Sequence, residues 1–211
     1  MDNLDPISVR VLGSLMEKEA TTPDNYPLTL NSLVAACNQT SNRDPVMSLD
    51  ESAVQRAIED LRKRSLVRAV QRSDSRVMRY RHLMGDGMST EEAAVMCVLM
   101  LRGAQTPGEI KGRTNRLYDF ADLAQLESTL ELLMKREFVA RLPRRPGQKE
   151  VRYAHLLSGE PAAESDEAAT EPAAPPVDEP RIDALERTVE TLRAELADLR
   201  TRFEEFWKEF Q

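Results

Sequence analysis

The stretch that decides the fold is residues 51–70, ESAVQRAIEDLRKRSLVRAV, because residues 123–142, LAQLESTLELLMKREFVARL, repeat its pattern 72 positions later. In both stretches apolar residues recur every three or four positions and β-type residues follow, which predicts an amphipathic helix and then a strand. The coinciding pairs include Val54 with Leu126, Ile58 with Leu130, Leu61 with Leu133 and Val67 with Val139. We therefore expect two copies of one structural unit.

The repeat extends on both sides of these stretches. Upstream, residues 11–23 match residues 95–107 at an offset of 84. Downstream, residues 79–83, RYRHL, match residues 152–156, RYAHL, at an offset of 73. The fall from 84 to 72 means that the first copy holds 12 additional residues between its first and third helices.

Each copy is predicted to contain three helices and a β-hairpin. In the first copy the apolar stripe of the first helix is Ile7, Val11, Leu12, Leu15 and Met16. Its second helix covers residues 30–38, its third begins after Ser48 or Asp50 as N-cap and ends near Ser65, and its strands are 66–70 and 77–82. In the second copy the helices are 90–102, 107–117 and 123–137, and the strands lie near 138–142 and 150–155. The polar hairpin loop is the wing of a winged-helix unit.

These patterns predict a mainly α fold with small β-hairpins, of the α+β class. We expect two tandem winged-helix (helix-turn-helix) domains, at residues 4–84 and 88–158, and a C-terminal coiled-coil helix. Residues 159–180 are rich in Pro, Ala and Glu and have almost no large apolar side chain, which predicts a disordered acidic linker.

Residues 181–211 carry a heptad pattern. Its apolar positions alternate at spacings of three and four, which is typical of a coiled coil. They are Ile182, Leu185, Val189, Leu192, Leu196, Leu199, Phe203, Phe206 and Phe210. The pattern predicts self-association into a homodimer or another small homo-oligomer. The alternative is a helix that folds back on its own domains through Phe203, Phe206, Trp207 and Phe210.

The composition suits a soluble protein of the cytoplasm. Hydrophobic residues make up 41% and charged residues 31% of the 211 positions, and the acidic start does not resemble a signal peptide. The longest apolar run, residues 93–101, is far shorter than the roughly 20 residues that span a bilayer, so we expect no membrane segment. Cys37 and Cys97 have no partner at metal-ligand spacing and are predicted to be buried free thiols.

The negative charge belongs to the C-terminal part of the chain. Residues 1–84 and 85–158 each carry a net charge of +1, whereas residues 159–211 carry −9, which together give the total of −7. An acidic chain as a whole is therefore compatible with nucleic-acid binding by its first two parts.

Several motifs resemble those of the bacterial YceH-like family. They are TPDNYPLT (22–29), CNQ (37–39), SNRDPV (41–46), RGAQTPGE (102–109) and LPRRPG (142–147), in order within residues 4–158. The resemblance implies a tandem winged-helix fold. It supplies no catalytic or binding residue, and the long Pro/Ala/Glu tether departs from what we expect throughout that family.

Basic residues collect on both predicted wings. In winged-helix proteins the third helix enters the major groove of DNA, and the wing holds phosphates. In the first copy the candidates for nucleic-acid binding are Arg56, Arg62, Lys63, Arg72, Arg76, Arg79 and Arg81. In the second copy they are Lys111, Arg113, Arg116, Arg144, Arg145 and Lys149. The third helix of the second copy is acidic, with Asp122, Glu127 and Glu131, which would repel phosphates.

The sequence lacks the signatures of an enzyme. It has no evident nucleophile with its base, no metal-ligand cluster and no phosphate-cradling glycine loop, so we expect no catalytic site, metal or cofactor. His82 and His155 occupy equivalent strand ends, which predicts a shared packing role. The polar residues of the insertion and its surroundings are expected to stabilise turns, with binding of a partner or of bases as the alternative. They are Asn25, Tyr26, Asn31, Asn38, Gln39, Asn42, Arg43 and Asp44.

The hypothesis from sequence is thus a non-enzymatic tandem winged-helix protein that binds double-stranded DNA, acts as a regulator and dimerises through its coiled coil. The alternative is a scaffold that uses its winged-helix surfaces to bind an unidentified protein partner.

Overall fold

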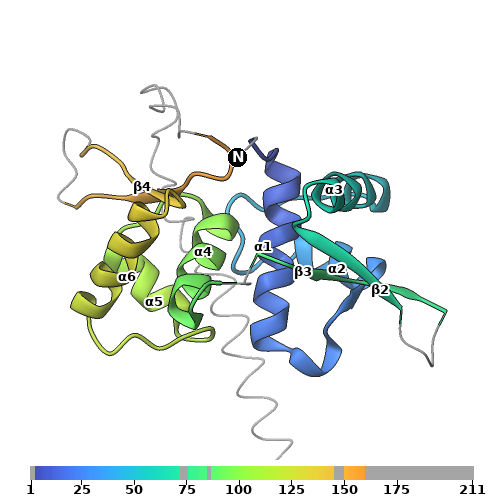
Figure 1. Cartoon of the computed structure of the whole chain (residues 1–211), viewed down its shortest axis with the longest axis horizontal. Coiled ribbons are helices and arrows are strands. Elements are labelled where there is room, and N and C mark those ends of the chain that lie inside the picture. Colours follow the sequence, from blue (N-terminus) through green and yellow to red (C-terminus); the bar gives the residue numbers. More distant parts are fainter. Residues whose placement is uncertain (1–2, 72–75, 85–86, 145–149, 160–211) are drawn as a thin grey trace, which may run out of the picture. The chain divides into compact units, whose positions relative to one another are not determined.

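The computed structural model describes residues 3–71, 76–84, 87–144 and 150–159. The predicted coiled coil (181–211) and the predicted linker beyond residue 159 lie outside these ranges. All described residues belong to one structural unit, Met1–Ala162. Within it the described chain forms six α-helices and two small antiparallel sheets, so the α+β class is confirmed (Figure 1).

The first half has three helices and a three-stranded sheet. Its elements are α1 (Pro6–Thr21), the 3-10 turn η1 (Pro23–Asn25), β1 (Leu28–Thr29), α2 (Leu30–Cys37), α3 (Glu51–Lys63), β2 (Val67–Gln71) and β3 (Met78–His82). The strands are antiparallel and lie in the order β1-β3-β2. The short strand β1 was not predicted, and it makes β3 the central strand.

The second half repeats this order of elements. They are α4 (Thr90–Arg102), α5 (Pro107–Thr114), α6 (Leu123–Lys135), β4 (Val139–Arg141) and β5 (Tyr153–His155), with β4 and β5 antiparallel. Gln105 forms a β-bridge with Tyr153, in the place that β1 occupies beside β3. The repeat found in the sequence is therefore a repeat of topology among the described residues.

Side-chain caps fix where the helices begin. Asp50 is the N-cap of α3 and accepts from Ala53 N–H, which decides between the two predicted caps. Ser89 with Glu92, and Thr106 with Glu109, form capping boxes at α4 and α5. The α5 helix ends three residues earlier than predicted.

Packing of α1 against α4 joins the two halves. Gly13 lies against the Leu101 side chain, and the Cys97 thiol donates to the Gly13 carbonyl at 3.6 Å. Gly13 and Cys97 are equivalent positions, 84 residues apart. Equivalent residues that touch each other are a sign of an approximate two-fold relation between their helices.

Hydrogen bonds hold the insertion of the first half against both α1 and α4. Arg43 is buried, and its Nη2 donates to Glu17 Oε2 at 2.6 Å and to the Ala36 carbonyl at 2.8 Å. Glu17, only 2% exposed, also accepts from Arg116 of the second half at 3.0 Å. Burial disfavours the charged carboxylate of Glu17, but the hydrogen bond and the charge of Arg43 hold its pKa below the ordinary value.

Further bonds tie the same insertion to the two halves. Arg10 of α1 donates to the Pro45 carbonyl at 2.6 Å, and Asp44 N–H donates to the Leu101 carbonyl of α4 at 2.9 Å. Arg102 donates to Asn42 Oδ1 at 2.6 Å. The polar residues of the insertion thus satisfy local and interhelical hydrogen bonds.

Candidate nucleic-acid interface

The helix α3 presents a polar face on the side away from the core. Its buried positions are Val54, Ala57, Ile58 and Leu61. Arg56, Arg62 and Lys63, all predicted to contact nucleic acid, are exposed on the other side. Arg56 donates to Ser52 Oγ at 3.1 Å, one turn earlier. Arg62 and Lys63 have no ion-pair partner among the described residues.

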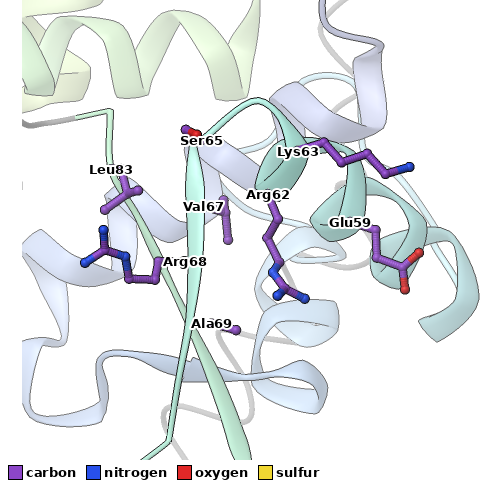
Figure 2. A pocket seen from close by; sticks show the side chains of 8 residues that line it. All are labelled: Glu59, Arg62, Lys63, Ser65, Val67, Arg68, Ala69 and Leu83. Carbon is purple, nitrogen blue, oxygen red and sulfur yellow. The ribbon is translucent and has the colours of Figure 1, made fainter.

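A hollow of about 640 Å³ lies between the end of α3 and strand β2. We call it the α3–β2 hollow. Its lining residues are Glu59, Arg62, Lys63, Ser65, Val67, Arg68, Ala69 and Leu83. Figure 2 shows Arg62 beside Val67 and Ala69, with Arg68 pointing to the other side of the strand. Three cationic side chains and one carboxylate give the hollow a net positive charge.

Strand β2 is an edge of its sheet, and its backbone adds donors to the hollow. Leu83 N–H donates to the Leu66 carbonyl, and Leu66 stands directly opposite Leu83 in the antiparallel register. Because hydrogen-bonded and non-hydrogen-bonded pairs alternate, the backbone N–H groups of Val67 and Ala69 point away from β3. Val67 is only 3% exposed, so the half-buried Ala69 supplies the N–H donor at this edge.

The outer face of the same sheet is also basic. Arg68 stands opposite Arg81 in the register, and Arg79 occupies the same face two positions before Arg81. Arg79 Nη1 donates to the Pro27 carbonyl at 2.9 Å, while the Nε atoms of Arg79 and Arg81 are buried without a hydrogen-bond partner. Like charges on opposite strands destabilise a sheet, so an anion bound beside these arginines would reduce their mutual repulsion. Arg76 is exposed, and Arg72 lies outside the described residues.

The predicted basic residues of the second half are largely engaged in the fold. Lys111 Nζ donates to the Phe120 carbonyl at 2.7 Å, and Arg113 lies 3.4 Å from Glu109. Arg116 is the partner of Glu17. Arg144 is exposed, while Arg145 and Lys149 lie outside the described residues. The structure therefore leaves fewer unpaired cations in the described part of this half.

Sequence reasoning missed Arg68, although a signal for it was present. Residues 68, 79 and 81 become neighbours only when the register of the hairpin is known, because each strand alternates between two faces. A three-residue row of arginines could have been found by pairing the two predicted strands about their loop. We add Arg68 to the candidate residues.

The two thiols and the metal-ligating residues offer no reactive group in the described chain. Cys37 and Cys97 are buried and free, as predicted. Burial raises the pKa of both thiols, that of Cys37 to about 11, so neither is a thiolate near neutral pH. Among the described residues, no group of three His, Cys, Asp or Glu side chains could hold a metal ion. None of the described helices is long and apolar enough to cross a membrane.

A family model described as "Protein of unknown function, DUF480" matches residues 4–148, which is more than half of the chain and includes every residue of the α3–β2 hollow. The chain belongs to the DUF480 family. This confirms the bacterial family resemblance that the motifs indicated.

Similar proteins come from several bacteria and match over nearly their full length. A UPF0502 protein of Geobacter sulfurreducens is 50% identical over 221 residues, covering 99% of this chain and 98% of its own. UPF0502 proteins of Solibacter usitatus and Vibrio atlanticus are 48% and 47% identical, covering 99% and 95% of this chain and 98% and 97% of their own. The similarity within the DUF480 family therefore extends beyond the matched residues 4–148.

Proposed function

We propose that this protein is a tandem winged-helix protein that binds double-stranded DNA through its first half. The observation that carries the proposal is the α3–β2 hollow, which is lined by Arg62, Lys63 and Arg68 and by a single carboxylate, Glu59. Phosphate contacts by Arg and Lys supply most of the sequence-independent affinity for DNA. A hollow with unpaired cations and a backbone N–H donor at the sheet edge suits this chemistry.

The order of elements supports the winged-helix part of the proposal. Three helices are followed by a β-hairpin, and a short strand before α2 completes a sheet in the order β1-β3-β2. In such units the third helix approaches the bases, and the hairpin approaches the backbone. Here α3 would offer Gln55 and Arg56 to base edges, while Arg62, Lys63 and Arg68 hold phosphates.

The proposed assembly includes the C-terminal heptads. A parallel or antiparallel coiled coil of residues 181–211 would bring two copies of the DNA-binding unit together and raise the affinity through multivalency. A DNA-binding unit joined to a coiled coil suits a cytoplasmic, non-enzymatic regulator, and this is the role that we propose.

The test compares two lysines at equivalent positions of the repeat. Lys63 and Lys135 are both exposed and lie 72 residues apart, at the ends of α3 and α6. DNA binding by the full chain is measured by fluorescence anisotropy over a range of salt concentrations. Lys63→Ala is expected to reduce the slope of log K against log salt by about 0.9, because one phosphate contact is lost. Lys135→Ala should leave the slope unchanged. Absence of binding at low salt, or an equal effect of both variants, would refute the proposal.

A second candidate function rests on α6. Leu132 is 52% exposed and Leu123 is 46% exposed, and Glu127 and Glu131 of the same helix are exposed as well. Exposed leucines with acidic neighbours suit a basic protein partner better than DNA. Under this scaffold hypothesis, Leu132→Ser reduces the amount of a specific cellular protein that co-purifies with the chain and leaves DNA binding unchanged.

A further inference from the structure

A second hollow, of about 240 Å³, lies between α1 and α4. We call it the α1–α4 hollow. Its walls are mostly apolar and include Met16, Ala94, Cys97 and Leu117, and its polar lining includes Glu19 and His82. It shares no residue with the α3–β2 hollow.

The repeat explains why this hollow is open. Gly13 and Cys97 touch at the α1–α4 contact, so the two sides of that contact are approximately equivalent. On one side the insertion is seated, with Pro45 held by Arg10 and Asp44 held by the Leu101 carbonyl. In the repeat, Arg10 corresponds to Ala94, and Ala94 lines the hollow. The second half has no such insertion, so the corresponding space on the other side is left unfilled.

The filled side indicates what the open side could accept. There, the α1 carboxylate of Glu17 receives a guanidinium, that of Arg43, at 2.6 Å. The open side also has an α1 carboxylate, because Glu19 is two residues further along the helix and lines the hollow. Glu19 differs from Glu17 in being 43% exposed rather than 2%, so an external cation would approach its carboxylate from solvent and share it with His82.

The position of Glu19 is fixed by its neighbour. His82 Nε2 lies 2.6 Å from Glu19 Oε2, and the backbone N–H of His82 donates to the Tyr26 hydroxyl at 2.8 Å. In the second half the residue equivalent to Glu19 is Gly103, which has no side chain and so cannot pair with the equivalent His155. The Glu19–His82 pair therefore occurs only in the first half of the repeat, and it lies at the α1–α4 hollow.

We propose that the α1–α4 hollow binds a small organic ammonium ion, with its charged group on Glu19 and its apolar body against Met16, Ala94 and Leu117. The size is appropriate, since an engineered apolar cavity of about 150 Å³ binds benzene. Burial of the apolar body supplies affinity, and the carboxylate selects for positive charge. Because the ligand contacts both α1 and α4, it stabilises the contact that joins the two halves.

The experiment uses the full chain and 2-phenylethylammonium as the probe, with the uncharged 2-phenylethanol as its counterpart of similar shape. Binding is measured by isothermal titration calorimetry and by the rise in melting temperature. The amine is expected to bind at about tenfold lower concentration than the alcohol, the effect of roughly one charge-assisted hydrogen bond. Glu19→Gln should abolish this preference and leave binding of the alcohol unchanged.

Two further variants make the result decisive. Ala93→Phe places a ring in the hollow, at a half-buried lining position, and should prevent binding of both compounds while the chain remains folded by circular dichroism. Glu131→Gln removes an exposed carboxylate on α6 and should change nothing. The proposal is wrong if neither compound binds at about 10 mM, a concentration at which even weak ligands are detected. It is equally wrong if Glu131→Gln weakens amine binding as much as Glu19→Gln does.

Discussion

The exposed faces of α3 and α6 come from equivalent positions of the repeat, yet their charges differ. The changes from the first half to the second are Gln55 to Glu127, Arg56 to Ser128, Arg62 to Met134 and, on the following strand, Arg68 to Ala140. The buried positions behave differently, since Val54, Ile58 and Leu61 correspond to three leucines. Packing constrains a core position to an apolar side chain of similar volume. The side chain at a surface position is constrained only by the molecules that it contacts.

The largest effect is expected at the ion pairs that distinguish the halves. Glu17→Ala leaves Arg43 buried without its carboxylate, so the free energy of unfolding should fall by about 3–5 kcal/mol. In the second half, Glu92 pairs with Arg136, whose side chain is 38% exposed and can return to water. Glu92→Ala should therefore cost only about 1 kcal/mol. Urea denaturation of both variants measures the difference, and equal losses would contradict this account.

The histidines at the two equivalent strand ends differ in surroundings, and this predicts a dependence on pH. Burial lowers the pKa of His155 from 6.5 to about 4. Between these values the unfolded chain binds a proton that the folded chain does not, so stability decreases as the pH falls. The total loss from this group is about 3 kcal/mol. His155→Leu should remove that part of the decrease between pH 6.5 and 4. Parallel stability curves for the two proteins would show that His155 is not responsible.

Exchanging surface residues between the halves tests the asymmetry of the DNA hypothesis. Arg62→Met with Arg68→Ala gives the first half the residues of the second half. Each lost phosphate contact should weaken DNA binding roughly eightfold in about 0.1 M salt. Arg113→Ala, which removes a cation of α5, serves as the control and should have little effect. Electrophoretic mobility shifts at constant salt measure both, and loss of binding only in the control would reverse the assignment of halves.

The smallest effect concerns two helical glycines. A Cβ on Gly13 would lie 3.0 Å from a Leu101 methyl, whereas a Cβ on Gly112 in α5 would meet no atom within 4 Å. Gly112→Ala should therefore stabilise the chain by about 0.5–1 kcal/mol through helix propensity alone. Gly13→Ala should lose that gain to crowding at the α1–α4 contact. Thermal unfolding measures both, and an equal gain for both would show that the contact is looser than described.

The sequence predicted the helices and hairpins well because they depend on local periodicity. The predicted helix at 90–102 coincides with α4, and α2 and α6 differ from prediction by one and two residues at their ends. The strand β1 was missed because two residues carry no periodic signal. The predicted coiled coil lies outside the described residues and stays a prediction.

The polar interior of α1 could not be predicted in the same way. Arg10, Ser14 and Glu17 recur at helical spacing opposite the apolar stripe, which is the pattern of a solvated face. In the structure all three are buried, because α4 and the insertion cover that face. Recognising them requires knowing that the two copies of the repeat pack on each other. The cationic row of Arg68, Arg79 and Arg81 likewise depends on strand register.

The contact between Gly13 and Cys97 has a consequence for how this protein can vary. In a symmetric homodimer made of identical chains, every substitution at the interface appears twice, so a change that suits one side must also suit the other. Here both copies lie on one polypeptide, and a glycine can face a cysteine at equivalent positions. Covalent linkage also removes the dependence of their association on protein concentration. Each copy is thereby free to lengthen a loop or to change its surface charge independently of the other.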